Sequence, residues 1–366
     1  MPHLATRAPS WVAHVDEALT VAVRKIHLLA AATPTNAESE RARLCDAATR
    51  DAPLSPAWIY APHKPNDTRA RLERVAKGLE TLGEDPLAKI YLARALELTC
   101  EAELCEAVGS PRFAELAAAR FKGDLRSAAG AQALTKKWKQ TKTREDTELI
   151  ASDSDDPDSL LSIMKREIGK RALPFRISVH RPLSSLAATG DGVILIACGR
   201  AITKEAALRT VLHEIEGHAL PRIRASKLAL AIFRIGTARG VDDQEGLALV
   251  LEERAGFLVG ERRHDLAARA HAVEAMRGGG NFAEIVTLLK KDHGRTPAHA
   301  ITIAERVFRG SDGNRPGLGR ESVYLESFIR VRDRLEEFPS DENVLASGQV
   351  SVDAIAALAA HVVSGD

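Results

Sequence analysis

Residues 211–220 read VLHEIEGHAL and carry two histidines and two glutamates inside an apolar helical pattern. His213, Glu214 and His218 bring together imidazole nitrogens and a carboxylate, which are ligand types that zinc takes. A catalytic zinc site keeps three protein ligands and an open position for water. In the short zinc-peptidase signature, H-E-x-x-H, the histidines are four residues apart on one helix face and the glutamate is the general base. The stretch therefore predicts a metal centre, but its histidines are five residues apart.

The five-residue spacing requires a distorted helix. At roughly 100° per residue, the second histidine of a regular α-helix lies about 140° round from the first, too far to share an ion. A π-turn, with its i to i+5 hydrogen bond, brings His218 beneath His213. Gly217 is compatible with such a turn, because glycine holds a regular helix poorly. We therefore expect a π-bulge between Glu214 and His218. A regular helix would support the alternative, in which both histidines are ordinary polar residues.

Composition and charge exclude several classes of protein. The 366 residues are 45% hydrophobic and 28% charged, with a formal net charge of +1, so the chain has the profile of a globular protein without a basic field for nucleic acid. The N-terminus, MPHLATRAPSW, lacks the apolar segment of a secretory signal, and no run of about eighteen apolar residues predicts a membrane span. Four scattered cysteines indicate reduced thiols. We expect a cytoplasmic protein that binds neither nucleic acid nor membrane.

The apolar periodicity divides the chain into two regions. Residues 1–150 show helical periods, the first over residues 12–32, followed by a loop rich in proline, and nothing there looks catalytic. Opposite charge runs predict a connector at residues 140–158. In residues 151–366, FRISVH and VILIAC have the pattern of strands, and Thr203 can cap the helix that follows. Residues 339–349 are expected to form a loop and residues 351–363 a final helix.

This order predicts an α+β, predominantly helical fold, with a small β-sheet packed over the helix that carries His213. The helical region 1–150 and the zinc metallopeptidase region 151–366 are expected to form one continuous compact unit. A strand edge over the active-site helix can bind an extended peptide by main-chain pairing. Such an arrangement suits a peptidase.

A third metal ligand is expected from the segment VDDQEGLALVLEERAGFLV. Glu245 is the preferred candidate, because it begins the apolar helix and Gly246 beside it allows a close helix approach. Asp242, Asp243 and Glu252 remain alternatives. A carboxylate at a helix start also has the simpler explanation that it favours the helix dipole.

Two motifs carry a resemblance to a known family. HEIEGH and QEGLA, the latter at residues 244–248, resemble the QEGLA-motif, or flavohaemoglobin-expression-modulating, family, which includes the microtubule-associated tyrosine carboxypeptidases. The resemblance implies a gluzincin-like zinc carboxypeptidase site of the H-E-x-x-x-H type. It makes His213, His218 and Glu245 the zinc ligands and Glu214 the catalytic base.

A third motif extends the resemblance, which runs from the N-terminal helices to about Arg334. The family pattern R-x-x-R-G followed by K-D-x-x-Y-L is matched at Arg306, Arg309, Gly310, Tyr324 and Leu325. Arg320 and Glu321 stand where the pattern has lysine and aspartate, and HALPRIRA departs from it in part. Nothing resembles an added microtubule-binding region, so tubulin is not carried over as the substrate.

The resemblance implies cleavage of a residue from the C-terminus of a peptide or protein tail. Zinc would activate water and polarise the scissile carbonyl, while Glu214 takes the water proton and passes it to the leaving amine. Tyr324 is a candidate donor to the oxyanion, and its alternative role is packing. A substrate carboxylate calls for an arginine, and the candidates are Arg222, Arg306 and Arg309. Two alternatives stay open: a non-catalytic or regulatory zinc-binding protein, and a zinc hydrolase of a non-peptide amide.

Overall fold

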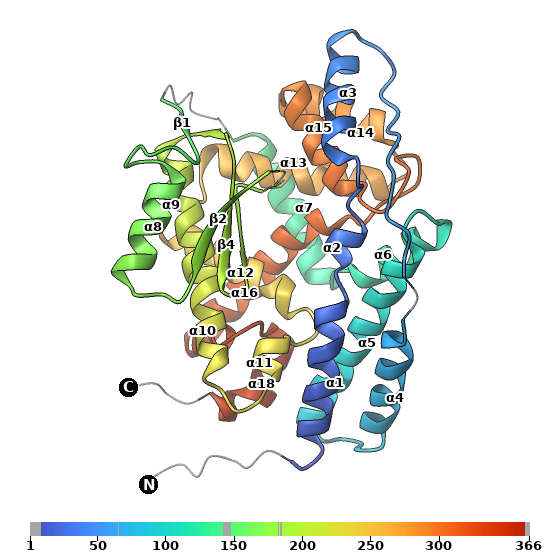
Figure 1. Ribbon diagram of the computed structural model, residues 1–366, viewed down its shortest axis with the longest axis vertical. Helices are drawn as coiled ribbons and strands as arrows, with labels where there is room; N and C mark the ends of the chain where they lie inside the picture. Colours follow the sequence, from blue (N-terminus) through green and yellow to red (C-terminus); the bar gives the residue numbers. More distant parts are fainter. Residues whose placement is uncertain (1–8, 65, 142–147, 182, 184, 363–366) are drawn as a thin grey trace.

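Helices make up most of the structure, and a small sheet lies at one side of them (Figure 1). The computed structural model describes residues 9–64, 66–141, 148–181, 183 and 185–362. The helices that precede the three-stranded sheet are α1 (Val12–Lys25), α2 (Leu28–Ala31), α3 (Ala37–Thr49), α4 (Thr68–Glu80), α5 (Pro86–Ala107), α6 (Pro111–Arg120), α7 (Leu125–Lys139) and α8 (Leu160–Lys170). Those that follow the sheet are α9 (Lys204–Leu212), α10 (Leu220–Ser226), α11 (Ile232–Ile235), α12 (Gly240–Arg254), α13 (Gly260–Arg277), α14 (Phe282–His293), α15 (Pro297–Val307), α16 (Val323–Glu337), α17 (Glu342–Leu345) and α18 (Ile355–Leu358). The predicted α+β, predominantly helical fold is confirmed.

The N-terminal helices follow the predicted periods with two exceptions. The first helix was predicted through residue 32, but α1 ends at Lys25 because Ile26 has extended backbone, and α2 begins afresh at Leu28. The prediction also missed α3, in a segment expected to be loop. Helix α3 buries few apolar side chains, so its period is weak in the sequence. A bidentate ion pair from Arg41 to Glu305 of α15, with 2.7 Å contacts, ties it to the rest of the protein.

The sheet combines the two predicted strands with one that was not predicted. FRISVH contains β2 (Arg176–His180) and VILIAC contains β4 (Val193–Ala197), and these two strands pair in parallel. Between them in sequence, β3 (Ala187–Gly190) pairs antiparallel to β4, so the spatial order is β2-β4-β3. A separate two-stranded pair joins β1 (Ile150–Ala151) to β5 (Ala201–Ile202). Thr203 caps α9 as predicted, because its side chain accepts a hydrogen bond from Ala206 N.

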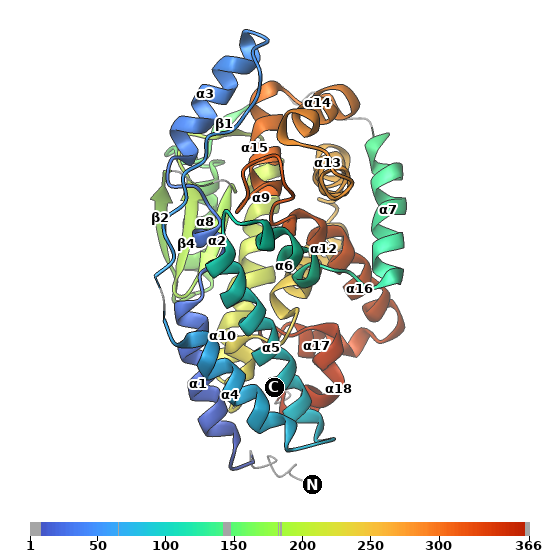
Figure 2. The ribbon, with the colours of Figure 1, turned by 90° about the vertical axis from the view of Figure 1, so that its right-hand side faces the viewer.

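One apolar core joins helices from both sides of residue 150. It includes buried side chains such as Leu19 of α1 and Tyr91 of α5, together with Leu249 of α12 and Phe328 of α16. Helix α7 packs on α13 and α16, although it is distant from both in sequence (Figure 2). This shared core supports a continuous unit, and the division at residue 150 stays a prediction.

The end of the chain differs from its prediction. Residues 339–349 were expected to be a loop, but they contain α17 and a 3₁₀ turn at Pro339–Asp341. Residues 351–363 were expected to form one helix, but the described part consists of the 3₁₀ turn Val352–Ala354, the four-residue α18 and the 3₁₀ turn Ala359–His361. The first two of these pieces bury their own apolar side chains, Ala354 in the 3₁₀ turn and Ile355 and Leu358 in α18, without the continuous hydrogen-bond ladder of one long helix.

Some predictions lie outside the described residues or concern the chain as a whole. The N-terminal residues 1–8 are not described, nor are residues 142–147 of the predicted connector or Val363 of the predicted last helix. Among the helices of the described residues, none has both the length and the apolar character to cross a bilayer. The cysteines are all unpaired, as expected: Cys45, Cys100, Cys105 and Cys198.

Candidate metal centre

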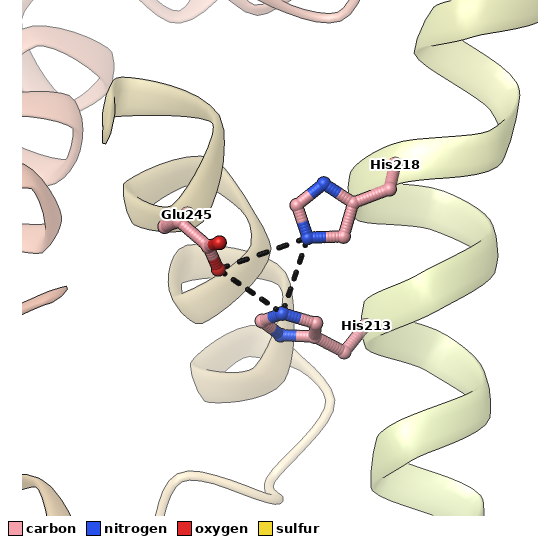
Figure 3. Close-up of side chains that lie close together, drawn as sticks. All are labelled: His213, His218 and Glu245. Carbon is pink, nitrogen blue, oxygen red and sulfur yellow. Dashed lines mark hydrogen bonds and ion pairs between the residues drawn. The ribbon is translucent and has the colours of Figure 1, made fainter. Parts of the chain in front are cut away.

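The stretch that carries both histidines is a π-helix, His213–Ala219, which continues α9 into α10. Its wider turn is visible in the hydrogen bond from Leu220 N to Ile215 O, five residues back. The two imidazoles therefore lie on one face, with 3.2 Å between their Nε2 atoms (Figure 3). The predicted distortion is confirmed, and the alternative of a regular helix with divergent histidines is ruled out.

Glu245 of α12 faces the two histidines, as Figure 3 shows. Its Oε2 atom lies 3.4 Å from His213 Nε2 and 3.7 Å from His218 Nε2. Two glycines permit this closeness. A Cβ on Gly217 would lie 2.6 Å from the Cβ of Ala248, and a Cβ on Gly246 would lie 2.4 Å from a backbone oxygen of α16. Helix α12 is thus pressed against the π-helix on one side and α16 on the other.

The three ligand atoms have the spacing of a tetrahedral metal site. With zinc–ligand bonds of about 2.0–2.1 Å, tetrahedral geometry places neighbouring ligand atoms about 3.3–3.4 Å apart. The distances here are 3.2, 3.4 and 3.7 Å. Of the described residues, His213, His218 and Glu245 form the group suited to hold a metal ion. Two neutral imidazoles and a carboxylate are a ligand set that zinc accepts.

Outer partners orient both imidazoles. Glu252, on α12, accepts a hydrogen bond from His213 Nδ1 at 2.8 Å, and Gln244 Oε1 accepts one from His218 Nδ1 at 3.1 Å. Because Nδ1 of each ring donates outward, each Nε2 lone pair is left to point at the shared centre. Arg262 donates two bonds of 2.8 Å to Glu252. Glu252, an alternative ligand in the sequence, therefore acts from the outer side of the histidine.

The other alternative ligands also point away from the centre. Asp242 accepts a hydrogen bond of 2.9 Å from Arg120, and Asp243 pairs with Arg330 at 3.1 Å. Glu245 is the acid of this segment that lies close to the Nε2 atoms of both histidines. The expected closeness of Glu245 to the π-helix is thus met.

The electrostatics of the centre favour a cation. Burial alone lowers the pKa of His213, but hydrogen bonds to Glu245 and Glu252 outweigh it and raise this pKa to about 10. Burial works against ionisation of Glu245 as well, yet the two histidines hold its pKa well below the usual value. The carboxylates of Glu245 and Glu252 therefore stay ionised and favour a positive charge near them. A divalent ion can supply this charge in place of protons.

Glu214 lies beside the ligands with a partner that the sequence reasoning missed. Its side chain is buried, and its Oε2 atom accepts a hydrogen bond of 2.7 Å from Thr189 Oγ1 on β3. Thr189 belongs to the unpredicted strand, so no local pattern pointed to it. The edge of the sheet thus touches the active-site helix, as the predicted layering requires.

Tyr324 and Arg320 lie close to Glu245. Arg320 Nη2 lies 3.4 Å from Glu245 Oε1. Burial raises the pKa of Tyr324, and the negative charges of Glu245 and Glu321 raise it further. The phenol therefore stays protonated at neutral pH and can donate a hydrogen bond.

The three candidate arginines have different surroundings. Arg306 is buried and binds Glu321 through Nε at 2.9 Å and Nη2 at 2.8 Å, so its guanidinium is committed to that ion pair. Arg309 lies near Arg306 and Glu321, and burial together with Arg306 lowers its pKa to about 10. Arg222 donates to Thr189 O at 3.3 Å. Burial lowers the pKa of Arg222, with Asp191 and Glu214 acting in the opposite sense, which places it near the catalytic-base candidate.

A buried metal-type centre, a neighbouring carboxylate and a protonated phenol define a hydrolase-like site within a mainly helical α+β fold. Residues 48–365 match the family described as microtubule-associated tyrosine carboxypeptidase. The match covers most of the chain, so the protein belongs to this family, and the predicted relationship is confirmed. Membership implies a carboxypeptidase, a hydrolase that acts on the end of a protein tail. A search of curated proteins finds no match.

Proposed function

We propose that the protein is a zinc-dependent metallocarboxypeptidase with a gluzincin-like site, in which His213, His218 and Glu245 bind the metal. The observation that carries the proposal is the convergence of their three ligand atoms at 3.2 to 3.7 Å on a π-turn and its facing helix. Family membership supplies the type of reaction. The orientation of both Nδ1 atoms by Glu252 and Gln244 fits a metal at the Nε2 side.

Glu214 is the proposed general base. A zinc ion in such a site supplies Lewis acidity, which eases deprotonation of water and polarises the scissile carbonyl. Glu214 follows the ligand His213 directly and is buried, so it can take the proton of the attacking water and deliver it to the leaving amine. Tyr324 is the proposed donor to the oxyanion, because its raised pKa keeps the hydroxyl proton in place.

Arg222 is the proposed partner of the substrate's terminal carboxylate. It lies near Glu214 and contacts the edge strand, whereas Arg306 is held by Glu321. Arg309 remains the second candidate. An extended peptide that pairs with β3 would bring its main chain past Glu214, because Thr189 of β3 contacts this carboxylate. The proposed substrate is therefore the C-terminal tail of a peptide or protein.

The test combines metal analysis with mass-spectrometric profiling of a peptide library. The purified protein is expected to contain about one zinc per chain and to release single C-terminal residues. Glu214→Gln should abolish release and keep the zinc, because the amide cannot accept the proton but preserves the shape. Glu216→Gln is the matched control: Glu216 lies on the same π-turn but pairs with Arg171, away from the ligands. Its activity should match the wild type.

Each of the other possible results of this experiment supports an alternative function or overturns part of the proposal. Zinc without cleavage of any peptide would replace the proposal by a non-catalytic or regulatory zinc protein. Cleavage of acyl amides but not peptides would indicate the non-peptide hydrolase. Full activity of Glu214→Gln would remove Glu214 from the role of base, and a protein that binds no zinc would overturn the proposal as a whole.

A further inference from the structure

The short strand β3 presents its free edge to the active-site helix. In the antiparallel pair with β4, residues alternate between bonding to the partner strand and facing outward. Leu186 O accepts a hydrogen bond from Ala197 N of β4, so Leu186 and Ala188 face the partner strand, while Ala187 and Thr189 face outward. In agreement with this alternation, Thr189 O accepts its hydrogen bond from Arg222. Thr189 is thus the residue whose main chain meets the candidate site.

The side chain of Thr189 holds the carboxylate of the proposed base. Its hydroxyl donates a hydrogen bond of 2.7 Å to Glu214 Oε2. A glutamate side chain has several rotatable bonds, and fixing them costs conformational entropy. A hydroxyl that binds one carboxylate oxygen fixes the glutamate side chain in the free protein, before a substrate binds. The other oxygen would then be the one to take the proton of the attacking water in the proposed reaction.

We propose that Thr189 is the positioning residue of the catalytic site, fixing Glu214 with its hydroxyl and Arg222 with its carbonyl. One residue of the edge strand then positions both the proposed base and the arginine that is proposed to bind the substrate carboxylate. The inference rests on the proposed function, since it assigns a role relative to Glu214. The contacts to Glu214 and to Arg222 can be tested separately, because a substitution of Thr189 removes the side-chain hydroxyl but leaves the main-chain carbonyl in place.

The hydroxyl is tested with Thr189→Val, which keeps the branched shape. We expect kcat to fall about 10- to 100-fold, the range found when a supporting partner of an active-site group is lost. KM should stay within about 2-fold, and zinc content should not change. The preference for a free C-terminal carboxylate over a C-terminal amide should also persist, because the main-chain contact to Arg222 remains. Thr189→Ser restores the hydroxyl and should recover most of kcat.

The matched control is Thr210→Val on α9. Thr210 is buried and donates its hydroxyl to Ala206 O at 2.7 Å, so the substitution removes a threonine hydroxyl whose hydrogen bond goes to a backbone carbonyl and not to the Glu214 carboxylate. Its kcat should equal that of the wild type. Thr189→Ala, which adds no methyl contact, provides a second variant with the same expected loss if the valine variant folds poorly.

The outcomes separate this inference from the proposed function. A Thr189→Val or Thr189→Ala protein with wild-type kcat, beside an inactive Glu214→Gln, overturns the positioning role and leaves the function intact. Equal losses in the serine and valine variants, or loss of zinc from the valine variant, also overturn it, since neither result comes from the hydroxyl acting on Glu214. Full activity of Glu214→Gln would instead remove the function on which the inference rests.

Discussion

The hydrogen bond from His213 to Glu252 allows a prediction about metal affinity. Glu252 is fully buried, and its carboxylate accepts one bond from His213 Nδ1 and two from Arg262, each at 2.8 Å. Arg262 and His213 outweigh the cost of burial and lower the pKa of Glu252 to about 2. The group therefore carries a full negative charge under any usable assay condition and makes His213 a stronger metal ligand.

Replacing Glu252 by glutamine removes this charge without changing its size. The amide keeps one acceptor atom and turns an N–H group toward either the histidine or Arg262, so at least one bond is lost. Loss of such an outer partner weakens metal binding about 10- to 100-fold, which corresponds to about 1.4–2.7 kcal/mol. Arg262, whose side chain is 12% exposed, also loses the counter-charge of the buried Glu252, so a fall of about 3 kcal/mol in the free energy of unfolding accompanies the change.

Zinc affinity should be measured by competition with a chromophoric chelator, with circular dichroism to show that the apoprotein is folded. Glu253→Gln is the control, since Glu253 is the next residue of the same helix and is not buried. We expect its zinc Kd to equal that of the wild type. If the zinc Kd of folded Glu252→Gln also stays within about 2-fold of the wild type, the argument that Glu252 tunes the centre is refuted.

Two further predictions concern stability. Gly217→Ala should lower the free energy of unfolding by about 1–3 kcal/mol, because the new Cβ would lie 2.6 Å from the Cβ of Ala248. The control is Gly78→Ala, at a helical glycine with no atom within 4 Å of the new Cβ, which should raise the free energy of unfolding slightly. Equal effects of the two substitutions in thermal melts would contradict the packing argument. Burial, with the neighbouring His271, lowers the pKa of His293 from 6.5 to about 3. Below pH 6.5 the unfolded chain therefore binds a proton that the folded chain refuses, and the free energy of unfolding should fall by up to about 1.4 kcal/mol per pH unit until the pH nears 3. Urea titrations from pH 7 to pH 4.5 should show this slope reduced in His293→Gln, and an unchanged slope would show that His293 is not its source.

The parts of the site that were predicted are those encoded by local spacing. The five-residue separation of His213 and His218 required a widened turn, with which Gly217 is compatible, and Gly246 indicated where another helix comes close. Both features involve neighbours in sequence or the lack of a side chain, so they can be recognised without knowing the fold. The strand patterns of β2 and β4 were recognisable for the same reason.

The missed parts depend on contacts between distant segments. Thr189 lies 25 residues before Glu214, on a four-residue strand whose sequence, AATG, has no alternation to reveal it. Arg306 pairs with Glu321, yet in the sequence Arg306 resembles any other helix arginine. Glu252 was noticed as an acid near the metal, but only the fold shows that it contacts Nδ1 of His213 from the outer side.

The N-terminal helices, which showed no catalytic pattern, hold α12, the helix that carries the proposed third ligand, in place. Arg120, at the end of α6, binds Asp242 at 2.9 Å and Glu97 of α5 at 3.1 Å. Glu97 in turn accepts a hydrogen bond of 2.8 Å from the backbone N of Arg239, the residue that precedes α12 and has a left-handed backbone with φ of 60°. A non-glycine residue keeps that conformation only where its surroundings enforce it. The ion-pair network thus fixes where α12 begins, and Glu245 lies less than two turns further along. The N-terminal helical region is therefore part of the frame that points Glu245 at the histidines.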